Sequence, residues 1–193
     1  MGRFAGVLAA ALILGMAVIG AAGSFAIGKT SLSGTVLDWN GQTITAKGSA
    51  YFTTAQSTTP LRAGTMRLES IRANTIALTL TSGKSQSLKE ASATGGVAIR
   101  AKRADQETTQ SGTVTVLRDV YATADSAVLP QTQDIIKLTG NVTVKVTEPG
   151  VAEPIALLSG EVVTVSLKDN KIRVEGQANK PAEFTVTPKE KKK

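Results

Sequence analysis

The residues that could do chemistry form a short set, because the sequence contains no histidine and no cysteine. Zinc sites in proteins normally use one or both of these residue types, so no metal site of that kind is expected. Serine–histidine and cysteine–histidine nucleophile systems are excluded, because each lacks its base or its nucleophile. The sequence therefore indicates no catalytic residues, no metal site and no cofactor.

Three polar residues recur at similar places and are the remaining candidates for a functional role. Asp125 lies 15 residues before Gly140, and Glu161 lies 15 residues before another glycine. Asn74 lies 21 residues before a third glycine. The pattern does not pair carboxylates for acid–base catalysis. We interpret the three residues as polar positions at strand starts that face solvent.

The glycines belong to a repeated phrase in which alternating apolar residues are interrupted by one glycine and then resume. Its fullest copy runs from Ile136 to Val144 as Ile-Lys-Leu-Thr-Gly-Asn-Val-Thr-Val. A repeated strand–turn–strand unit predicts stacked hairpins that share one continuous core. The repeat glycines are Gly48, Gly95, Gly140 and Gly176.

Composition favours an all-β fold. Val, Ile, Thr, Ala and Gly are abundant whereas aromatic residues make up only 4%, and β-branched, turn-rich sequence favours strands. A charged loop is expected at 104–107, and an ordinary antiparallel sandwich is the alternative architecture. Strands are expected at 32–39, 42–54, 64–81, 86–101, 111–129, 134–147, 155–168 and 171–186.

Alternation along these strands places one set of apolar side chains on a shared face. A glycine on that face leaves a gap or permits a bend. A sheet bent at the same level in every repeat would fold over itself and enclose an apolar groove that is open along one side. The same apolar face could also form a closed core. The residues expected to line the interior are Ile136, Leu138, Val142, Val144, Ile172, Val174, Val97 and Ile99.

The N-terminus carries a second strong signal, the uncharged run of 24 residues Phe4–Ile27. As a helix rising about 1.5 Å per residue it would be about 36 Å long, enough to cross a bilayer. It is either a signal peptide cut near 21–23 or an uncleaved signal anchor with Arg3 inside. Both interpretations export the rest of the chain. We therefore expect a hydrophobic helix over 1–29.

The net charge of +7 lies largely at the two ends of the chain. Arg3 contributes one positive charge and the tail 189–193 contributes three, which leaves +3 for the body. We expect one folded domain over 30–187 and a basic disordered tail over 188–193, either solvated or touching acidic lipid head groups. The sequence shows no basic stripe with stacking aromatics, so nucleic-acid binding is not expected.

A family resemblance rests on the repeated phrases. Ala-Asp-x-Ala from Ala124, followed about 15 residues later by Leu-x-Gly-Asn-Val-x-Val, resembles the OstA-like proteins of lipopolysaccharide transport, the LptA and LptC group. The match covers 70–187 well and 35–70 weakly. It implies an open β-jelly roll of stacked, creased antiparallel strand pairs, preceded by the hydrophobic helix. It also implies a non-enzymatic function, in which lipopolysaccharide or a similar amphiphile passes along the interior.

The resemblance further implies a periplasmic protein that associates head to tail with itself or with related jelly-roll components. A cleaved N-terminus would resemble LptA, and an uncleaved one, anchored in the inner membrane, would resemble LptC. The candidate docking edge is the C-terminal strand with Phe184, Thr185 and Val186. The alternative is a structural β-repeat scaffold or adhesin-like assembly protein whose closed core binds no amphiphile, and an enzyme is least favoured.

Overall fold

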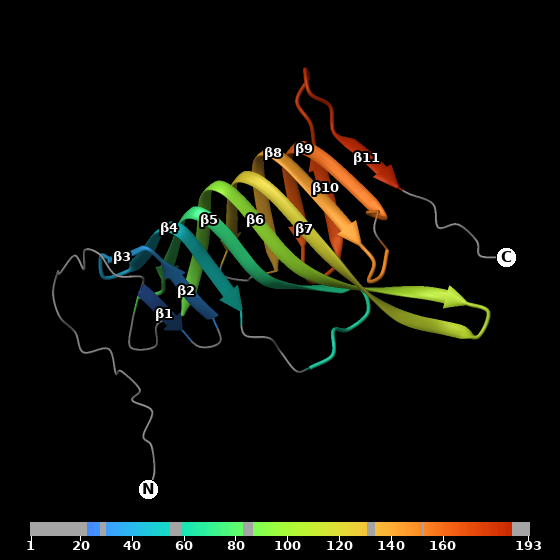
Figure 1. Cartoon of the computed structure of the whole chain (residues 1–193), viewed down its shortest axis with the longest axis horizontal. Helices are drawn as coiled ribbons and strands as arrows, with labels where there is room; N and C mark the ends of the chain where they lie inside the picture. The colour runs from blue at the N-terminus through green and yellow to red at the C-terminus, as the bar shows by residue number, and fades with distance from the viewer. Residues whose placement is uncertain are drawn as a thin grey trace, which may run out of the picture.

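The computed structural model describes residues 23–27, 30–54, 59–82, 87–130, 134–151 and 153–186. These residues form one antiparallel sheet of 11 strands, and the elements assigned within them include no helix. Among the residues described, no helix is therefore long and apolar enough to cross a membrane. Most strands pair with their neighbours in chain order (Figure 1). The expected all-β architecture is confirmed.

Nine strands follow one continuous path across the sheet, in the order β1-β2-β4-β5-β6-β7-β8-β9-β10. At the two ends of this path, β3 also pairs with β4, and β11 also pairs with β9. The strands are β1 (Gly23–Ile27), β2 (Thr30–Gly34), β3 (Val36–Trp39), β4 (Thr43–Thr54), β5 (Thr65–Leu80), β6 (Leu88–Thr109), β7 (Gly112–Pro130), β8 (Ile135–Thr147), β9 (Ala156–Ser166), β10 (Lys171–Glu175) and β11 (Glu183–Val186).

The strands bury one face of the sheet because apolar and polar residues alternate along them. In β8, Leu138 and Val144 are 1% and 0% exposed, whereas Lys137 and Lys145 are exposed to solvent. The same alternation in the neighbouring strands makes this face continuous from β2 to β9. An apolar face of this size must be removed from water, and the sheet does so by folding over itself.

The fold line is a row of β-bulges that align across the sheet, which we call the crease. The pairing register shifts at 47–50 in β4, at 94–97 in β6 and at 139–142 in β8. Bulges of this kind bend a strand and increase its twist. In each of the three strands two successive residues have positive φ, and these pairs are Gly48-Ser49, Gly95-Gly96 and Gly140-Asn141.

The neighbouring strands β5, β7 and β9 each place a polar residue beside the crease. By register, Asn74 of β5, Asp125 of β7 and Glu161 of β9 lie opposite the positive-φ pairs. A Cβ added to Gly95 would come within 3.0 Å of the Asn74 Cβ, and one added to Gly140 within 2.8 Å of the Asp125 Cβ. These two glycines are therefore needed both for their φ and for close approach.

The structure corrects the interpretation of Asn74, Asp125 and Glu161 as residues at strand starts. All three lie within the long strands β5, β7 and β9, at the crease. Gly176 also differs from the other repeat glycines, because its φ is not positive. It lies where β10 ends, and a Cβ there would approach the carbonyl carbon of Pro181 to 2.6 Å.

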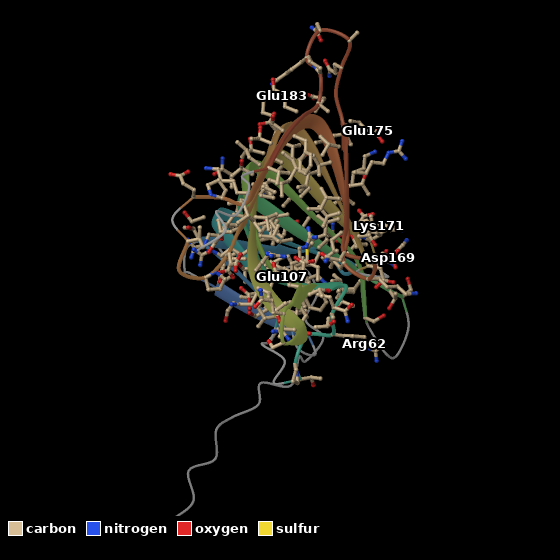
Figure 2. The ribbon with its side chains drawn as sticks, turned by 90° about the vertical axis from the view of Figure 1, so that its right-hand side faces the viewer. Arg62, Glu107, Asp169, Lys171, Glu175 and Glu183 are labelled. Atoms are coloured by element: carbon tan, nitrogen blue, oxygen red, sulfur yellow. The ribbon has the colours of Figure 1, made fainter. Side chains whose placement is uncertain are left out.

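The crease divides the sheet into two leaves that face each other across the core, and the strands arch from one leaf to the other (Figures 1 and 2). Seen end-on in Figure 2, Lys171 and Glu175 lie on one side of the arch and Glu183 lies on the other. Leaf 1 comprises 36–39, 43–47, 75–80, 88–94, 126–130, 135–139, 162–166 and 171–175. Leaf 2 comprises 23–27, 30–34, 50–54, 65–73, 97–104, 118–124, 142–147, 156–160 and 183–186.

Some sequence-based boundaries are wrong. Residues 23–27 form β1, so the expected helix over 1–29 does not extend through them, and 1–22 lie outside the described residues. The reason is that Phe25 pairs with Leu32 of β2 and packs against the core. The expected strand at 171–186 is two strands, because the chain turns between β10 and β11. The basic tail 188–193 also lies outside the described residues.

The charged segment 104–107 is not a loop but part of β6, which pairs with β7 as far as Thr109 and Gly112. Beyond Ala104 the pairing with β5 has ended, and before Asp119 the pairing with β8 has not begun. Residues 105–117 therefore form a two-stranded ribbon, which projects beyond the body of the fold in Figure 1.

The crease predicts that replacement by alanine is more costly at Gly140 than at Gly96, although both glycines have positive φ. Gly140→Ala should lower the free energy of unfolding by about 3 kcal/mol, because φ strain and a clash with Asp125 combine. Gly96→Ala is the matched control, because a Cβ there meets nothing within 4 Å, and it should cost only about 1 kcal/mol. Urea denaturation of both variants measures the difference. Equal losses would mean that the contact with Asp125 does not constrain the crease.

Candidate functional site

The residues predicted to line the interior all lie on the inner face of the arch. Six of the eight are buried, with exposed fractions of at most 4%. Ile172 and Val174 of β10 are partly buried and pack against the same core. Contact of these residues with a lipid stays a prediction. The six buried residues are Ile136, Leu138, Val142, Val144, Val97 and Ile99.

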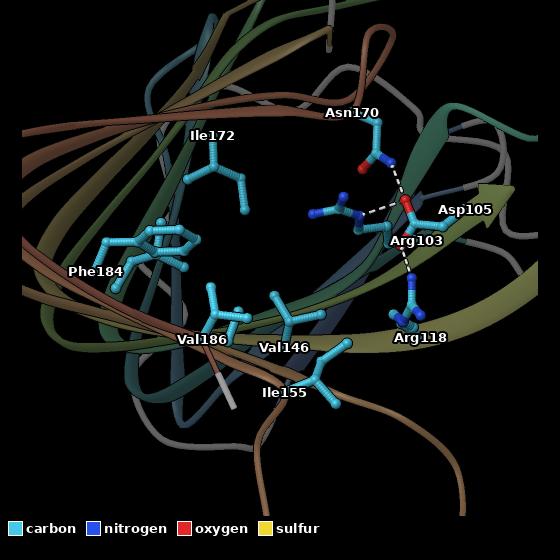
Figure 3. A pocket seen from close by; sticks show the side chains of 11 residues that line it. Arg103, Asp105, Arg118, Val146, Ile155, Asn170, Ile172, Phe184 and Val186 are labelled. Carbon is cyan, nitrogen blue, oxygen red and sulfur yellow. Dashed lines mark hydrogen bonds and ion pairs between the residues drawn. The ribbon is translucent and has the colours of Figure 1, made fainter. Parts of the chain in front are cut away.

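The interior is filled by side chains in the middle of the arch and hollow at its C-terminal end. From β4 to β9 the interior is closed, because Phe52 of β4, Ile76 of β5 and Val163 of β9 are each 0% exposed. At the C-terminal end, a cavity of about 500 Å³ lies between β10 of leaf 1 and β9 and β11 of leaf 2. We call this cavity the mouth. Its apolar wall consists of Val146, Ile155, Ala156, Leu158, Ile172, Phe184 and Val186 (Figure 3).

The opposite wall of the mouth is a network of charged side chains at the root of the β6–β7 ribbon. Asp105 accepts hydrogen bonds from Arg103 Nε at 2.8 Å and from Arg118 Nη1 at 2.6 Å. Arg118 also donates to Glu107, and its Nη2 lies 3.8 Å from an oxygen of Glu148. The side chains of Arg118 and Asp105 are only 10% and 12% exposed. This burial makes the network sensitive to the loss of any one member.

The network perturbs the pKa of both central groups. Burial alone would raise the pKa of Asp105, but the hydrogen bonds from Arg103 and Arg118 outweigh burial and hold it below its usual value of 3.8. Burial alone would lower the pKa of Arg118, but the bonds to Asp105 and Glu107 raise it above its usual value. Both groups therefore remain charged at neutral pH, and each stabilises the charge of the other.

Two contacts connect the two sides of the arch at the mouth and beside it, and we call them the clasp. Asn170, in the turn after β9, donates from Nδ2 to Asp105 Oδ1 at 2.7 Å. The backbone N–H of Met66 in β5 donates to the carbonyl of Leu167 at 2.7 Å. The first contact joins the root of the β6–β7 ribbon, and the second joins the start of β5 in leaf 2, to the turn between β9 and β10 of leaf 1. The clasp closes the open side of the arch at this level.

The charges of the mouth determine which ligand groups it can accept. Two arginines face three carboxylates, so the network has a net charge of −1 and offers no surplus cation to a phosphate. Asn170 Oδ1 is buried and accepts no hydrogen bond from the residues described, and it points into the mouth in Figure 3. The mouth therefore suits an apolar chain that carries a hydrogen-bond donor. Within the described ranges, no cluster of acidic residues could hold a metal ion.

The predicted docking residues lie at the rim of the mouth. β11 pairs only with β9, through Phe184 opposite Leu158 and Thr185 opposite Leu157, so its outer edge has no partner strand among the residues described. Phe184 and Val186 are 65% and 55% exposed and contribute to the mouth. Docking through this edge stays a prediction.

Sequence reasoning missed the polar wall of the mouth, although the sequence carried a signal for it. The inward phase Val97-x-Ile99-x-Ala101 continues in the same register to Arg103, Asp105 and Glu107. Charged residues in the inward phase of a strand indicate either a buried ion network or the end of the strand, and the loop expected at 104–107 corresponds to the second of these. Asn170 has no such signal, because its contact with Asp105 joins residues far apart in the chain.

The network predicts a pH-dependent contribution to stability. Asp105→Asn should cost about 3 kcal/mol at neutral pH, because it leaves Arg118 buried without its main partner. The matched control Asp38→Asn, which removes a solvent-exposed pair with Lys47, should cost less than about 1 kcal/mol. Because the folded-state pKa of Asp105 is depressed, its contribution is present above the unfolded pKa and lost as pH falls through the folded one. The free energies of unfolding of the wild type and of Asp105→Asn should therefore begin to converge as pH falls below about 3.8. A cost independent of pH would contradict the role assigned to the carboxylate.

Comparison with known proteins gives a likeness of fold. Neither a family model nor a curated protein matches the sequence. Among solved structures, the chain is similar to LptH of Pseudomonas aeruginosa, described as the LptA homologous periplasmic component of the lipopolysaccharide transport device. The alignment covers 82% of this chain and 95% of LptH, with a TM-score of 0.54 and 10% sequence identity. The chain therefore has an LptA-like β-jelly-roll fold.

Proposed function

We propose that this chain is an exported, non-enzymatic carrier of lipopolysaccharide or a similar amphiphile in the periplasm. The observation that carries the proposal is the mouth, a cavity of about 500 Å³ with one apolar wall at the open end of a creased sheet. Pockets that bind drug-sized ligands span about 300 to 1,000 Å³. Each CH₂ group transferred from water into such an environment contributes about 0.8 kcal/mol, so acyl chains bind there without any catalytic group.

The packed middle of the arch sets a condition on this function. An acyl chain can pass from the mouth toward β4 only if the leaves separate, because Phe52, Ile76 and Val163 are fully buried between them. Opening of the clasp would allow this separation, since Asn170–Asp105 and Met66–Leu167 join the two sides of the arch. We therefore propose a carrier that loads at the mouth and opens along one side as the chain advances.

A structural scaffold is the second candidate, and the same packed middle favours it. A scaffold would keep the interior closed and bind no amphiphile. The proposal covers an LptA-like role with a cleaved N-terminus and an LptC-like role with a retained one. The carried lipid is likewise part of the proposal. The likeness to LptH and the uncharged run at the N-terminus support export to the periplasm, either soluble or anchored to the inner membrane.

Photo-crosslinking in cells that make lipopolysaccharide tests the carrier directly. Ile172 lines the mouth, whereas the side chain of Arg173, the next residue in β10, is 78% exposed. With p-benzoylphenylalanine in place of Ile172, we expect a light-dependent adduct that an antibody to lipid A detects. With the same group in place of Arg173, we expect none. Absence of an adduct from Ile172 in folded protein would favour the scaffold, and equal adducts from both would contradict an interior path.

The proposed head-to-tail association through β11 has a separate test. Thr185→Pro removes one backbone donor from the edge strand, and it should weaken crosslinking between purified copies by at least about tenfold. Thr185→Ala keeps that donor and should associate like the wild type. Circular dichroism confirms that the sheet remains folded in both. Undiminished association of folded Thr185→Pro would exclude docking through this edge.

A further inference from the structure

The outer face of leaf 2 gathers cationic and aromatic side chains that are far apart in the sequence. In the register of the sheet, Tyr51 of β4 lies opposite Arg72 of β5. Arg100 of β6 lies opposite Tyr121 of β7, and Tyr121 lies opposite Lys145 of β8. We call these five residues the leaf 2 patch. It spans four strand intervals of about 4.8 Å, or about 19 Å.

The cations of the leaf 2 patch are available to a partner. Arg72, Arg100 and Lys145 are exposed, and none of them forms an ion pair with any residue that the structure describes. This distinguishes them from Arg103 and Arg118, whose charges are used inside the mouth. The patch therefore presents three unneutralised positive charges on one face of the sheet, which attracts a surface of negative charge.

Acidic residues do not cancel this field. In the leaf 2 segments of β4 to β8 the carboxylates are Glu69 and Asp119, and Asp119 already pairs with Lys102 at 3.4 Å. On β9, next to Lys145, Leu157 adds an apolar side chain that is 36% exposed. The face thus combines cations, tyrosines and an exposed leucine, the residue types that suit the boundary between lipid head groups and acyl chains.

The tyrosines also favour a membrane over a nucleic acid as the partner of the leaf 2 patch. The Arg72 guanidinium lies 5.0 Å from the centre of the Tyr51 ring, and that of Arg100 lies 5.2 Å from the centre of the Tyr121 ring. Each ring therefore has a face covered by a guanidinium, which hinders stacking of a base on that face. Phosphates of lipid head groups need only the outward N–H groups of the arginines.

The start of the described chain gives an independent reason to place a bilayer on this side. β1 belongs to leaf 2 and forms the end of the uncharged run that begins at Phe4. From β1, two strand steps through β2 lead to Tyr51 on β4, a distance of about 10 Å. As a helix, the uncharged residues 4–22 would be about 28 Å long, close to the thickness of a hydrocarbon core. A membrane tether at this position would hold leaf 2 near lipid.

We infer that the outer face of leaf 2 is a docking surface for an anionic bilayer, against which the leaf lies through Arg72, Arg100 and Lys145. This contact is additional to the carrier function and does not depend on it, because it uses the outer face of the sheet and not its interior. It would fix the orientation of the arch on the membrane surface.

Lysine footprinting of the full chain tests this docking. The protein is mixed with nanodiscs of phosphatidylcholine alone or of phosphatidylcholine and phosphatidylglycerol in about equal parts, and then treated with a membrane-impermeant amine-reactive ester. In the anionic discs, labelling of Lys145 should fall about fivefold or more and return at about 0.5 M salt. Labelling of Lys137, on the outer face of leaf 1, should not change.

Two charge variants complete the test. Arg72→Glu with Arg100→Glu should abolish the protection of Lys145 in anionic discs. Lys137→Glu with Lys171→Glu, an equal change of charge on the outer face of leaf 1, should preserve it. Equal labelling of Lys145 of the wild type in both kinds of disc would overturn the proposal. This comparison does not require the variants to fold. Protection by single-stranded DNA in place of anionic discs would also overturn it.

Discussion

The structure depends on one constraint, the close packing of a positive-φ residue pair in one strand against a polar side chain in the next. Gly140 and Asn141 illustrate it, because the backbone turns there directly beside Asp125, and Asn141 Nδ2 donates to Asp125 Oδ2 at 3.0 Å. Gly95 repeats the arrangement against Asn74. Because these positions align across the sheet, the strands β4 to β9 all bend at the same level, and a sheet with one apolar face becomes an arch that encloses that face.

The arch explains both the packed interior and the open mouth. Strands that cross the crease contribute to both leaves, so each added strand buries residues such as Leu138 and Val142 on both sides of the fold line. At the C-terminal end no single strand continues across, because β10 and β11 each pair with one half of β9. The mouth lies where this continuity ends, and the ion network around Asp105 supports its polar wall. The site is thus a consequence of how the repeat terminates.

The sequence predicts the parts of this fold that depend on local pattern. Alternation identified the inner face correctly, and the glycine phrase located the bend, since both properties belong to single strands. The pairing of Asp125 with Gly140 was visible only as a constant spacing, because the bulge that joins them depends on register. The segment 104–107 of the β6–β7 ribbon is predicted as a charged loop, because Asp105 and Glu107 are more polar than the inward residues of a typical strand. Contacts between distant segments, such as Asn170 with Asp105 or Arg100 with Tyr121, left no pattern in the sequence.

We propose that the arch encloses an amphiphile and not only its own side chains. Native mass spectrometry of the full chain, purified without harsh detergent from cells that make lipopolysaccharide, measures this most directly. We expect a bound mass equal to one lipid-A-containing amphiphile per chain. This mass should be lost when Val142→Asp places a charge on the inner face and kept when Thr143→Asp places one on the outer face. A wild-type chain that carries no such mass, and that takes up none when lipopolysaccharide is added, would contradict this proposal.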